Sequence, residues 1–281
     1  MAELLKGNSV VEELREEIAN KVFDLKRKEV TPTLAILRVG ENPSDLSYEK
    51  SVIKKAGELG IEVLVKSLDL NVKQEEFDNA LYELNDNDKI HGILMFRPLP
   101  KQLDEEKARN MIKPDKDIDG CGDTSLAGIF TNTSLGYPPC TAEACLKILD
   151  TYDIDITGKN VCVIGRSLVI GKPVSMMLLN RNATVTICHS KTENVAEIAS
   201  KSDILVSCIG KLGYVTSDFA NENQIIIDVG INWNEKIGKI SGDVDFDNVS
   251  DKVSKITPVP GGVGGVTSMI LLKHVVEAAE K

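Results

Sequence analysis

The chain has no run of apolar residues long enough to cross a membrane and no excess of positive charge. A membrane-spanning helix needs roughly 18 or more consecutive apolar residues, and no segment approaches that length. The 33 basic and 43 acidic side chains leave a net charge of −10, which disfavours broad attraction to nucleic acid or to an anionic membrane. The sequence MAELLKGNSVVEEL at the N-terminus lacks the features of a signal or transit peptide. We therefore expect a cytoplasmic protein that acts on small molecules, without nucleic-acid or membrane partners.

Metal-binding patterns of cysteine and histidine are also missing. The six cysteines are scattered through apolar segments without a C-x-x-C pair, and no histidine stands at metal-ligand spacing. We expect reduced, buried thiols and no metal site.

What the sequence does contain is an alternation of strand-like apolar runs with helical patterns. With 281 residues, 42% of them hydrophobic, the chain exceeds a typical single domain, so we expect two domains. Buried β-branched runs joined by helices predict parallel sheets with helices on both faces, an α/β fold. The predicted strands are 33–39, 62–68, 92–96, 160–164, 184–188, 204–207 and 225–229, and the clearest helices are 10–28, 44–59, 74–85 and 142–150.

A segment rich in glycine, aspartate, threonine and proline separates the two series of elements. We predict loops throughout residues 115–139 and place the domain boundary just after them. An amphipathic helix is predicted at 267–279, after the glycine-rich stretch PGGVGG. The expected domains are 1–140 with 267–281, and 141–266.

The most specific local signal is a glycine turn directly after the strand at 160–164. Gly165 permits a tight turn, Gly171 lets backbone approach a phosphate, and Pro173 suits the first turn of a helix whose N–H groups face the anion. The spacing is not the usual G-x-G-x-x-G, and glycines at such turns also occur in proteins that bind no nucleotide. The order of strand, turn and helix nevertheless predicts a Rossmann-type dinucleotide site.

Two features favour NADP over NAD as the dinucleotide. Arg166 extends a cation from the phosphate turn, where it could pair with the additional phosphate of NADP. The strand at 184–188 is followed by His189 and Ser190, not by the Asp or Glu that binds the ribose hydroxyls in NAD-specific folds. A ribose phosphate would meet no repulsion there and could accept from Arg166 and Ser190.

Several ordered segments resemble the bifunctional methylenetetrahydrofolate dehydrogenase/cyclohydrolase family. They are VGENPSDLSY, GILMFRPLP, PDKDIDG, PPCTA, GRSLVIGKP, CHSKT and TPVPGGVGGVT, and they span nearly the whole chain. The resemblance implies an N-terminal three-layer α/β catalytic domain that binds tetrahydrofolate derivatives, a Rossmann-type NADP domain, and an active-site cleft between them. It also implies a homodimer. The implied reaction is hydride transfer from 5,10-methylenetetrahydrofolate to the nicotinamide, which gives the methenyl cation.

The same resemblance assigns roles to individual residues. Tyr48 would stack on the aromatic part of the folate, and Asp119 would accept paired N–H donors from the pterin edge. Taken alone, Tyr48 could be a half-buried packing residue and Asp119 a turn residue. The further implied substrate contacts are Leu99, Pro260, Gly261 and Gly262, and the implied cofactor contacts are Gly165, Arg166, Ser167, Gly171, Pro173, His189, Ser190, Thr141 and Ile231.

Among the departures from the family pattern, those at Val52 and Phe96 concern its second activity, hydrolysis of the methenyl group to 10-formyltetrahydrofolate. The family motif Tyr-x-x-x-Lys has Val52 in place of the lysine that transfers protons. The motif GILVQLPLP has Phe96 in place of the glutamine, followed by Arg97. Because losing general acid–base help costs about 100-fold to 10,000-fold, we expect a dehydrogenase with little or no cyclohydrolase activity. Lys55, on the same helical face as Tyr48, is a weak candidate substitute.

Other interpretations stay open at this point. The chain could be fully bifunctional with a displaced acid–base residue, or a binding protein that keeps both pockets without catalysis. An unrelated Rossmann dehydrogenase acting on an amino or hydroxy acid would leave the N-terminal motifs unexplained.

Overall fold

The computed structural model describes residues 2–235 and 237–281, and its internal contacts divide the chain into two compact units. One unit contains the described residues through Glu12 together with Thr141–Thr267, and we call it the six-stranded unit. The other contains Glu13–Cys140 and Ser268–Lys281, and we call it the three-stranded unit. The domain limits expected from the sequence differ from this division in the placement of the residues through Glu12 and of Thr267.

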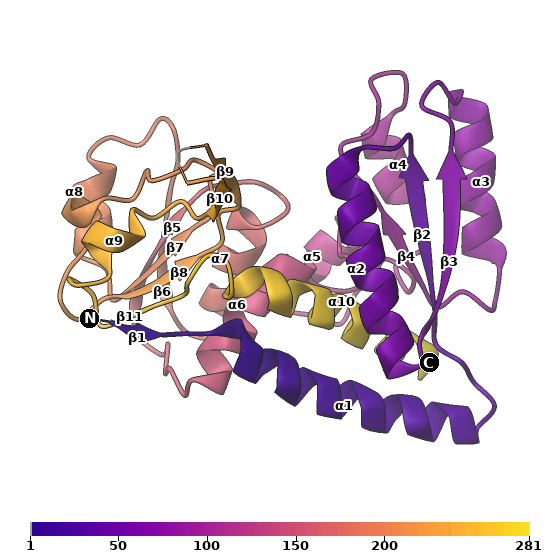
Figure 1. Ribbon diagram of the computed structural model, residues 1–281, viewed down its shortest axis with the longest axis horizontal. Helices are drawn as coiled ribbons and strands as arrows, with labels where there is room; N and C mark the ends of the chain where they lie inside the picture. The colour runs from indigo at the N-terminus through magenta and orange to yellow at the C-terminus, as the bar shows by residue number, and fades with distance from the viewer. Residues whose placement is uncertain (1, 236) are drawn as a thin grey trace. The chain divides into compact units, whose positions relative to one another are not determined.

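The three-stranded unit is built on a parallel sheet with the order β3-β2-β4. Its strands are β2 (Thr33–Val39), β3 (Glu62–Leu68) and β4 (Gly92–Met95). Helices α2 (Pro43–Leu59) and α3 (Gln74–Asp86) lie on opposite sides of these strands, as right-handed crossovers in both directions require (Figure 1). The central strand is therefore covered on both faces, and Leu34–Leu37 have no exposed surface.

Local signals fix both ends of α2, the helix that carries Tyr48. The Asn42 side chain accepts from the backbone N–H of Ser44 at 3.0 Å, Pro43 opens the helix, and Gly60 ends it with φ of 76°. A buried ion pair joins the helix to β2, with Arg38 Nε 2.9 Å from Glu49 Oε2. These contacts hold the first turns of α2 against the end of β2.

The six-stranded unit has a fully parallel sheet with the order β1-β11-β8-β7-β5-β6. The strands are β1 (Glu3–Leu4), β5 (Asn160–Ile164), β6 (Thr184–Cys188), β7 (Ile204–Ser207), β8 (Ile225–Asp228) and β11 (Lys255–Ile256). Helices α7 (Gly171–Asn180) and α8 (Val195–Ser200) connect the strands from β5 to β7, and a hairpin of β9 (Asn232–Asn234) and β10 (Lys239–Ser241) follows β8. Because the chain leaves β5 for β6 and returns to β7 on the other side, the strand order reverses beside β5, where open α/β sheets bind ligands.

Three helices contain the points at which the chain passes from one unit to the other. They are α1 (Gly7–Arg27), α6 (Cys140–Thr151) and α10 (Val263–Ala279). No helix in the described ranges 2–235 and 237–281 has the length and apolar character that a membrane span requires.

The expectation of loops throughout 115–139 is wrong, because α5 (Asp123–Thr131) lies within that segment. Its start is held by Asp117, whose carboxylate accepts from Gly122 N at 2.9 Å and from Ser125 Oγ at 2.6 Å. A short helix that was not predicted, α4 (Glu105–Met111), begins where Asp104 accepts from Lys107 N at 2.9 Å.

The last helix also differs from its prediction. It begins at Val263, inside the glycine-rich stretch, and not at Thr267. Most of its side chains are buried, including Met269, Leu272 and Val276, so it is an apolar core helix and not an amphipathic one.

Candidate functional site

Polar side chains from separate elements of the three-stranded unit gather around Asp119. Tyr48 comes from α2, Cys140 from the start of α6, and Ser268 from α10. Burial raises the pKa of the Tyr48 phenol, and the Asp119 carboxylate raises it further, whereas a hydrogen bond with Ser268 opposes the shift. The two residues expected to bind the folate therefore lie close together, and the phenol stays neutral at physiological pH.

Asp119 forms an ion pair with Arg97, whose Nη2 atom lies 3.5 Å from Asp119 Oδ2. Burial raises the pKa of the Asp119 carboxyl, and Arg97 is the largest influence that lowers it again. The side chains of Asp119 and Arg97 keep 29% and 19% of their surface exposed, so this ion pair remains accessible to a ligand.

The loop that carries Asp119 is fixed by its neighbour Asp117. The Asp117 carboxylate is almost fully buried and accepts from Cys121 N, in addition to its two bonds at the start of α5. Gly120 adopts φ of 62°, and a Cβ there would lie 2.4 Å from the Tyr137 carbonyl oxygen. The position of Asp119 thus depends on a buried carboxylate and on a residue without a side chain.

His274 of α10 lies behind the loop and is buried. Its Nδ1 atom is 2.8 Å from the Ile118 carbonyl oxygen, which can only accept, so Nδ1 carries the proton. The ring packs 4.9 Å from that of Tyr137, and Cys140 Sγ donates to the same carbonyl at 3.2 Å. Sequence reasoning missed Cys140, Ser268 and His274, because no local pattern links α6 and α10 to Asp119.

The two positions that depart from the family pattern provide no proton-transfer group. Val52 is fully buried, and Phe96 places its ring 5.9 Å from that of Tyr48 at 42°. Burial and the Arg15 charge lower the pKa of Lys55, and Glu58 raises it, so the charges that act on Lys55 are not those of Tyr48 or Asp119. Within the described part of the chain, the groups that shift the pKa values of Tyr48 and Asp119 include no lysine.

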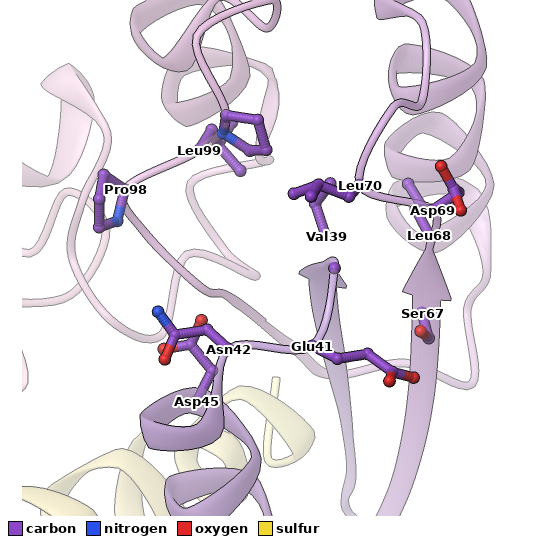
Figure 2. A pocket seen from close by; sticks show the side chains of 12 residues that line it. Val39, Glu41, Asn42, Asp45, Ser67, Leu68, Asp69, Leu70, Pro98 and Leu99 are labelled. Atoms are coloured by element: carbon purple, nitrogen blue, oxygen red, sulfur yellow. The ribbon is translucent and has the colours of Figure 1, made fainter.

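A pocket of about 920 Å³ opens at the carboxyl ends of the three parallel strands. Figure 2 shows Pro98 and Leu99 on one side of it, and Leu70 with Val39 on the other, above the first turn of α2. Leu99 is the implied substrate contact among its lining residues. This edge of a parallel sheet is where ligands of open α/β folds bind.

The turn between β5 and α7 has the backbone geometry expected of a phosphate site. Gly165 adopts φ of 133°, and a Cβ there would lie 2.6 Å from Cys208 Sγ. A Cβ on Gly171 would lie 2.3 Å from the Gly165 carbonyl oxygen, so close packing within the turn itself requires this glycine. Ser167 Oγ accepts from Ile170 N at 3.1 Å, and Pro173 lies in the first turn of α7.

The residues expected to distinguish NADP follow two paired strands. Ile164 is the register partner of Cys188, so Arg166 and the segment His189–Ser190 emerge at the same edge of the sheet. Arg166 and Ser190 are both exposed. His189 has a local structural role, because its Nδ1 accepts from Lys191 N at 3.2 Å.

The remaining implied contacts belong to the six-stranded unit. Thr141 lies in the first turn of α6, and Ile231, which follows β8, is 65% exposed. Gly261 adopts φ of 105° and its carbonyl accepts from Gly7 N at 2.8 Å. Pro260 is exposed, whereas a Cβ on Gly262 would lie 2.6 Å from the Pro258 carbonyl oxygen. The glycine-rich stretch is therefore a defined turn and not a flexible loop.

A buried carboxylate that sequence reasoning missed shapes the loop after β7. Asp243 Oδ2 accepts from Ser207 Oγ at 3.1 Å and from Ile209 N at 2.9 Å, and Oδ1 accepts from Lys211 N at 2.8 Å. This loop starts at the sheet edge beside β5, so Asp243 fixes one wall of the dinucleotide region.

Sequence profiles of one family match both halves of the chain. The tetrahydrofolate dehydrogenase/cyclohydrolase catalytic domain matches residues 5–119, and the NAD(P)-binding domain of the same family matches residues 139–281. The chain is 48% identical to the bifunctional protein FolD of Clostridium botulinum, covering 100% of this chain and 99% of that protein. It is 46% identical to FolD of Carboxydothermus hydrogenoformans, with coverage of 100% and 98%.

Solved structures of FolD enzymes also match the chain over almost its full length. The bifunctional enzyme FolD of Campylobacter jejuni, a methylenetetrahydrofolate dehydrogenase/cyclohydrolase, superimposes with a TM-score of 0.97 at 38% identity and covers 100% of this chain and 99% of its own. The Trypanosoma brucei enzyme, solved with NADP and an inhibitor, gives a TM-score of 0.93 at 32% identity, with coverage of 99% and 97%.

Proposed function

Because the chain belongs to the tetrahydrofolate dehydrogenase/cyclohydrolase family, we propose that it oxidises 5,10-methylenetetrahydrofolate to 5,10-methenyltetrahydrofolate with NADP. The observation that carries this proposal is the close approach of Tyr48 and Asp119 in the unit that matches the catalytic domain. The family match over both halves excludes an unrelated Rossmann dehydrogenase.

The residues of the six-stranded unit fit NADP. The turn from Gly165 to Gly171 leads into the N-terminus of α7, where backbone N–H groups favour an anion. Arg166 and Ser190 supply a cation and a hydroxyl at one edge, and no carboxylate ends β6. When bound, NADP supplies the hydride acceptor for the reaction.

The three-stranded unit would bind and orient the folate. Asp119 would accept N–H donors from the pterin edge, with its charge supported by Arg97 at 3.5 Å. Tyr48 would offer a neutral ring for stacking, and the buried Phe96 beside it would exclude water from the reacting carbon. Positioning of this kind is the main contribution of a protein whose cofactor carries the chemistry.

A turnover assay tests the proposal. Purified protein supplied with methylenetetrahydrofolate and NADP should form NADPH, measured by its absorbance, and should do so far more slowly with NAD. A protein that binds both ligands without forming NADPH would instead support the alternative of a non-catalytic binding protein.

Hydrolysis of the methenyl group is a second candidate activity. Relatives that match the whole chain are named bifunctional, and this supports the fully bifunctional alternative better than the expectation of a dehydrogenase alone. Val52 and Phe96 remain the reason for expecting slow hydrolysis. Rapid enzyme-dependent conversion of methenyltetrahydrofolate to the 10-formyl product would establish a bifunctional enzyme. Conversion no faster than in buffer without enzyme would establish a dehydrogenase alone.

The oligomeric state, the location and the domain limits stay predictions from the resemblance. We propose a cytoplasmic homodimer whose folate domain comprises 1–140 with 267–281 and whose NADP domain comprises 141–266.

A further inference from the structure

We propose that Arg97 is a specificity-determining residue of the pterin site, whose guanidinium donates to the 4-oxo group while Asp119 accepts from the neighbouring N–H groups. The proposal rests on the proposed function, because it concerns the same folate ligand. It assigns a ligand contact to a residue that departs from the family motif GILVQLPLP, in which the corresponding position is leucine.

The Arg97 side chain is held in place but is not saturated by protein partners. A guanidinium has five N–H donors, and within the part of the chain that the structure describes Arg97 makes one side-chain hydrogen bond, to Asp119. The 3.5 Å separation is long for a charge-assisted hydrogen bond, for which about 2.7–2.9 Å is usual. The other donors of this mostly buried cation are therefore available to a ligand.

Two other arginines of the three-stranded unit provide a comparison, because protein acceptors hold their guanidinium groups. Arg38 pairs with Glu49 at 2.9 Å and also donates to the Gly40 carbonyl. Arg109 donates to the Cys121 carbonyl at 2.6 Å and pairs with Asp123. Each makes at least one close hydrogen bond to a fixed protein acceptor, whereas Arg97 makes only a long contact with the carboxylate proposed to bind substrate.

The donor and acceptor pattern of this pair complements one edge of a pterin. That edge presents the N3–H and 2-amino donors beside the 4-oxo acceptor, so a carboxylate and a guanidinium side by side can satisfy both kinds of group. Asp119 already favours a 4-oxo pterin, because a neutral 4-amino analogue lacks the N3–H donor and keeps only its amino groups. Arg97 adds a second preference at C4 itself, because a guanidinium donates to the 4-oxo group and has no acceptor for an amino group.

Neighbouring contacts fix where Arg97 can reach. Phe96 packs 5.9 Å from the ring of Tyr48, and Leu99 N donates to Glu105 Oε2 at 2.8 Å. Arg97 lies between these two anchored positions, so its backbone is held in place and the side chain is free to adjust.

Binding of two ligands that differ at C4 tests the proposal. Folic acid carries the 4-oxo group and aminopterin carries a 4-amino group, and the affinity of each is measured by calorimetry or fluorescence. In Arg97→Leu we expect folic acid to bind about 10-fold to 100-fold more weakly, the usual loss for a hydrogen bond to a charged group, and aminopterin to change by less than about twofold. Lys101→Leu, which removes an exposed cation from the same loop, should leave both affinities unchanged.

Equal weakening of both ligands in Arg97→Leu would overturn the proposal, since it would mean that Arg97 acts only through Asp119. No weakening of folic acid would overturn it as well. Asp119→Asn should weaken both ligands, and that result would uphold the folate site even if the Arg97 prediction failed. Binding of neither ligand to the wild type would contradict the site and the proposal together. If Arg97→Leu proves unstable on heating, Arg97→Met has the same expected outcome.

Discussion

The turn between β5 and α7 is built from backbone, whereas the surroundings of Asp119 are built from side chains that distant segments contribute. Gly165 and Gly171 matter because of the space that a Cβ would occupy, and both lie in one short stretch of sequence. Asp119 instead depends on Arg97, Tyr48 and residues of α6 and α10. A backbone site of this kind tolerates change in most of its side chains, but a side-chain site can change its chemistry through a single substitution.

The largest effect that this comparison predicts is loss of the dinucleotide in Gly171→Val. The new Cβ would lie 2.3 Å from the Gly165 carbonyl oxygen, so the turn must open. Because the cofactor phosphate would lose hydrogen bonds from backbone N–H groups of the turn, each worth about 1.5–3 kcal/mol, we expect NADPH affinity to fall by about 100-fold in a fluorescence titration. Gly57→Ala is a matched control, since a Cβ there meets nothing within 4 Å. Near-normal NADPH affinity in Gly171→Val would show that the turn does not bind the cofactor.

Asp119→Asn should have the next largest effect, and this effect should be on folate binding. It replaces a charged acceptor in a partly buried site, which typically costs about 1.5–3 kcal/mol, or roughly 10-fold to 100-fold in folate affinity. NADPH affinity should stay the same. Asp115→Asn, an exposed aspartate in the same loop, is the control. If Asp119→Asn bound folate normally, the pterin site would have to lie elsewhere.

Arg166→Gln tests the one cation that is proposed to contact NADP at the turn between β5 and α7. Removing an exposed guanidinium that pairs with the additional phosphate should weaken NADP by about tenfold and leave NAD nearly unchanged. Competition titrations with the two cofactors measure the ratio, and Arg181→Gln, on an exposed arginine that pairs with Asp150, is the control. Equal loss for both cofactors would assign Arg166 to the shared pyrophosphate instead.

The sequence predicts the strands well, because each is a run rich in β-branched and other apolar residues, whether it is buried on both faces, as β2 is, or partly exposed, as β3 is. The bounds of β2, β3, β5, β6 and β7 agree with their predictions residue for residue. The start of α5 could not be predicted in this way, because Asp117, which holds it, is separated from it by a loop. The first turn of α10 contains Gly264 and Gly265, residues of low helix propensity, so the sequence places the start of this helix too late.

The residues of the candidate sites also divide into those that the local sequence predicts and those that it does not. Gly165 and Pro173 follow from the local order of strand, turn and helix. The contacts of Asp119 with Cys140 and His274 join α6 and α10 to a distant loop, and no periodic pattern indicates such a meeting. Asp243 was missed for the same reason, since its partners lie more than 30 residues away at Ile209 and Lys211.

The smallest predicted effect is a shift in the pH dependence of folate binding. Burial raises the pKa of Asp119, and the groups that act on it are Arg97, Asp117, Cys140, His274 and Tyr48. Binding needs the ionised carboxylate, so folate affinity should fall as the pH falls through this pKa. Because Arg97 is the largest influence that lowers the pKa, Arg97→Leu should move this acid limb to higher pH. Well above this pKa the contribution to affinity should be negligible, whereas at the acid limb it should appear as a loss of folate binding. Titrations of folate affinity between pH 4 and 8 measure the midpoint independently of the maximal affinity, and Lys101→Leu should leave it in place. An unmoved midpoint in Arg97→Leu would mean that the ion pair contributes little to the charge of Asp119 and that the other side chains of the pocket control its ionisation.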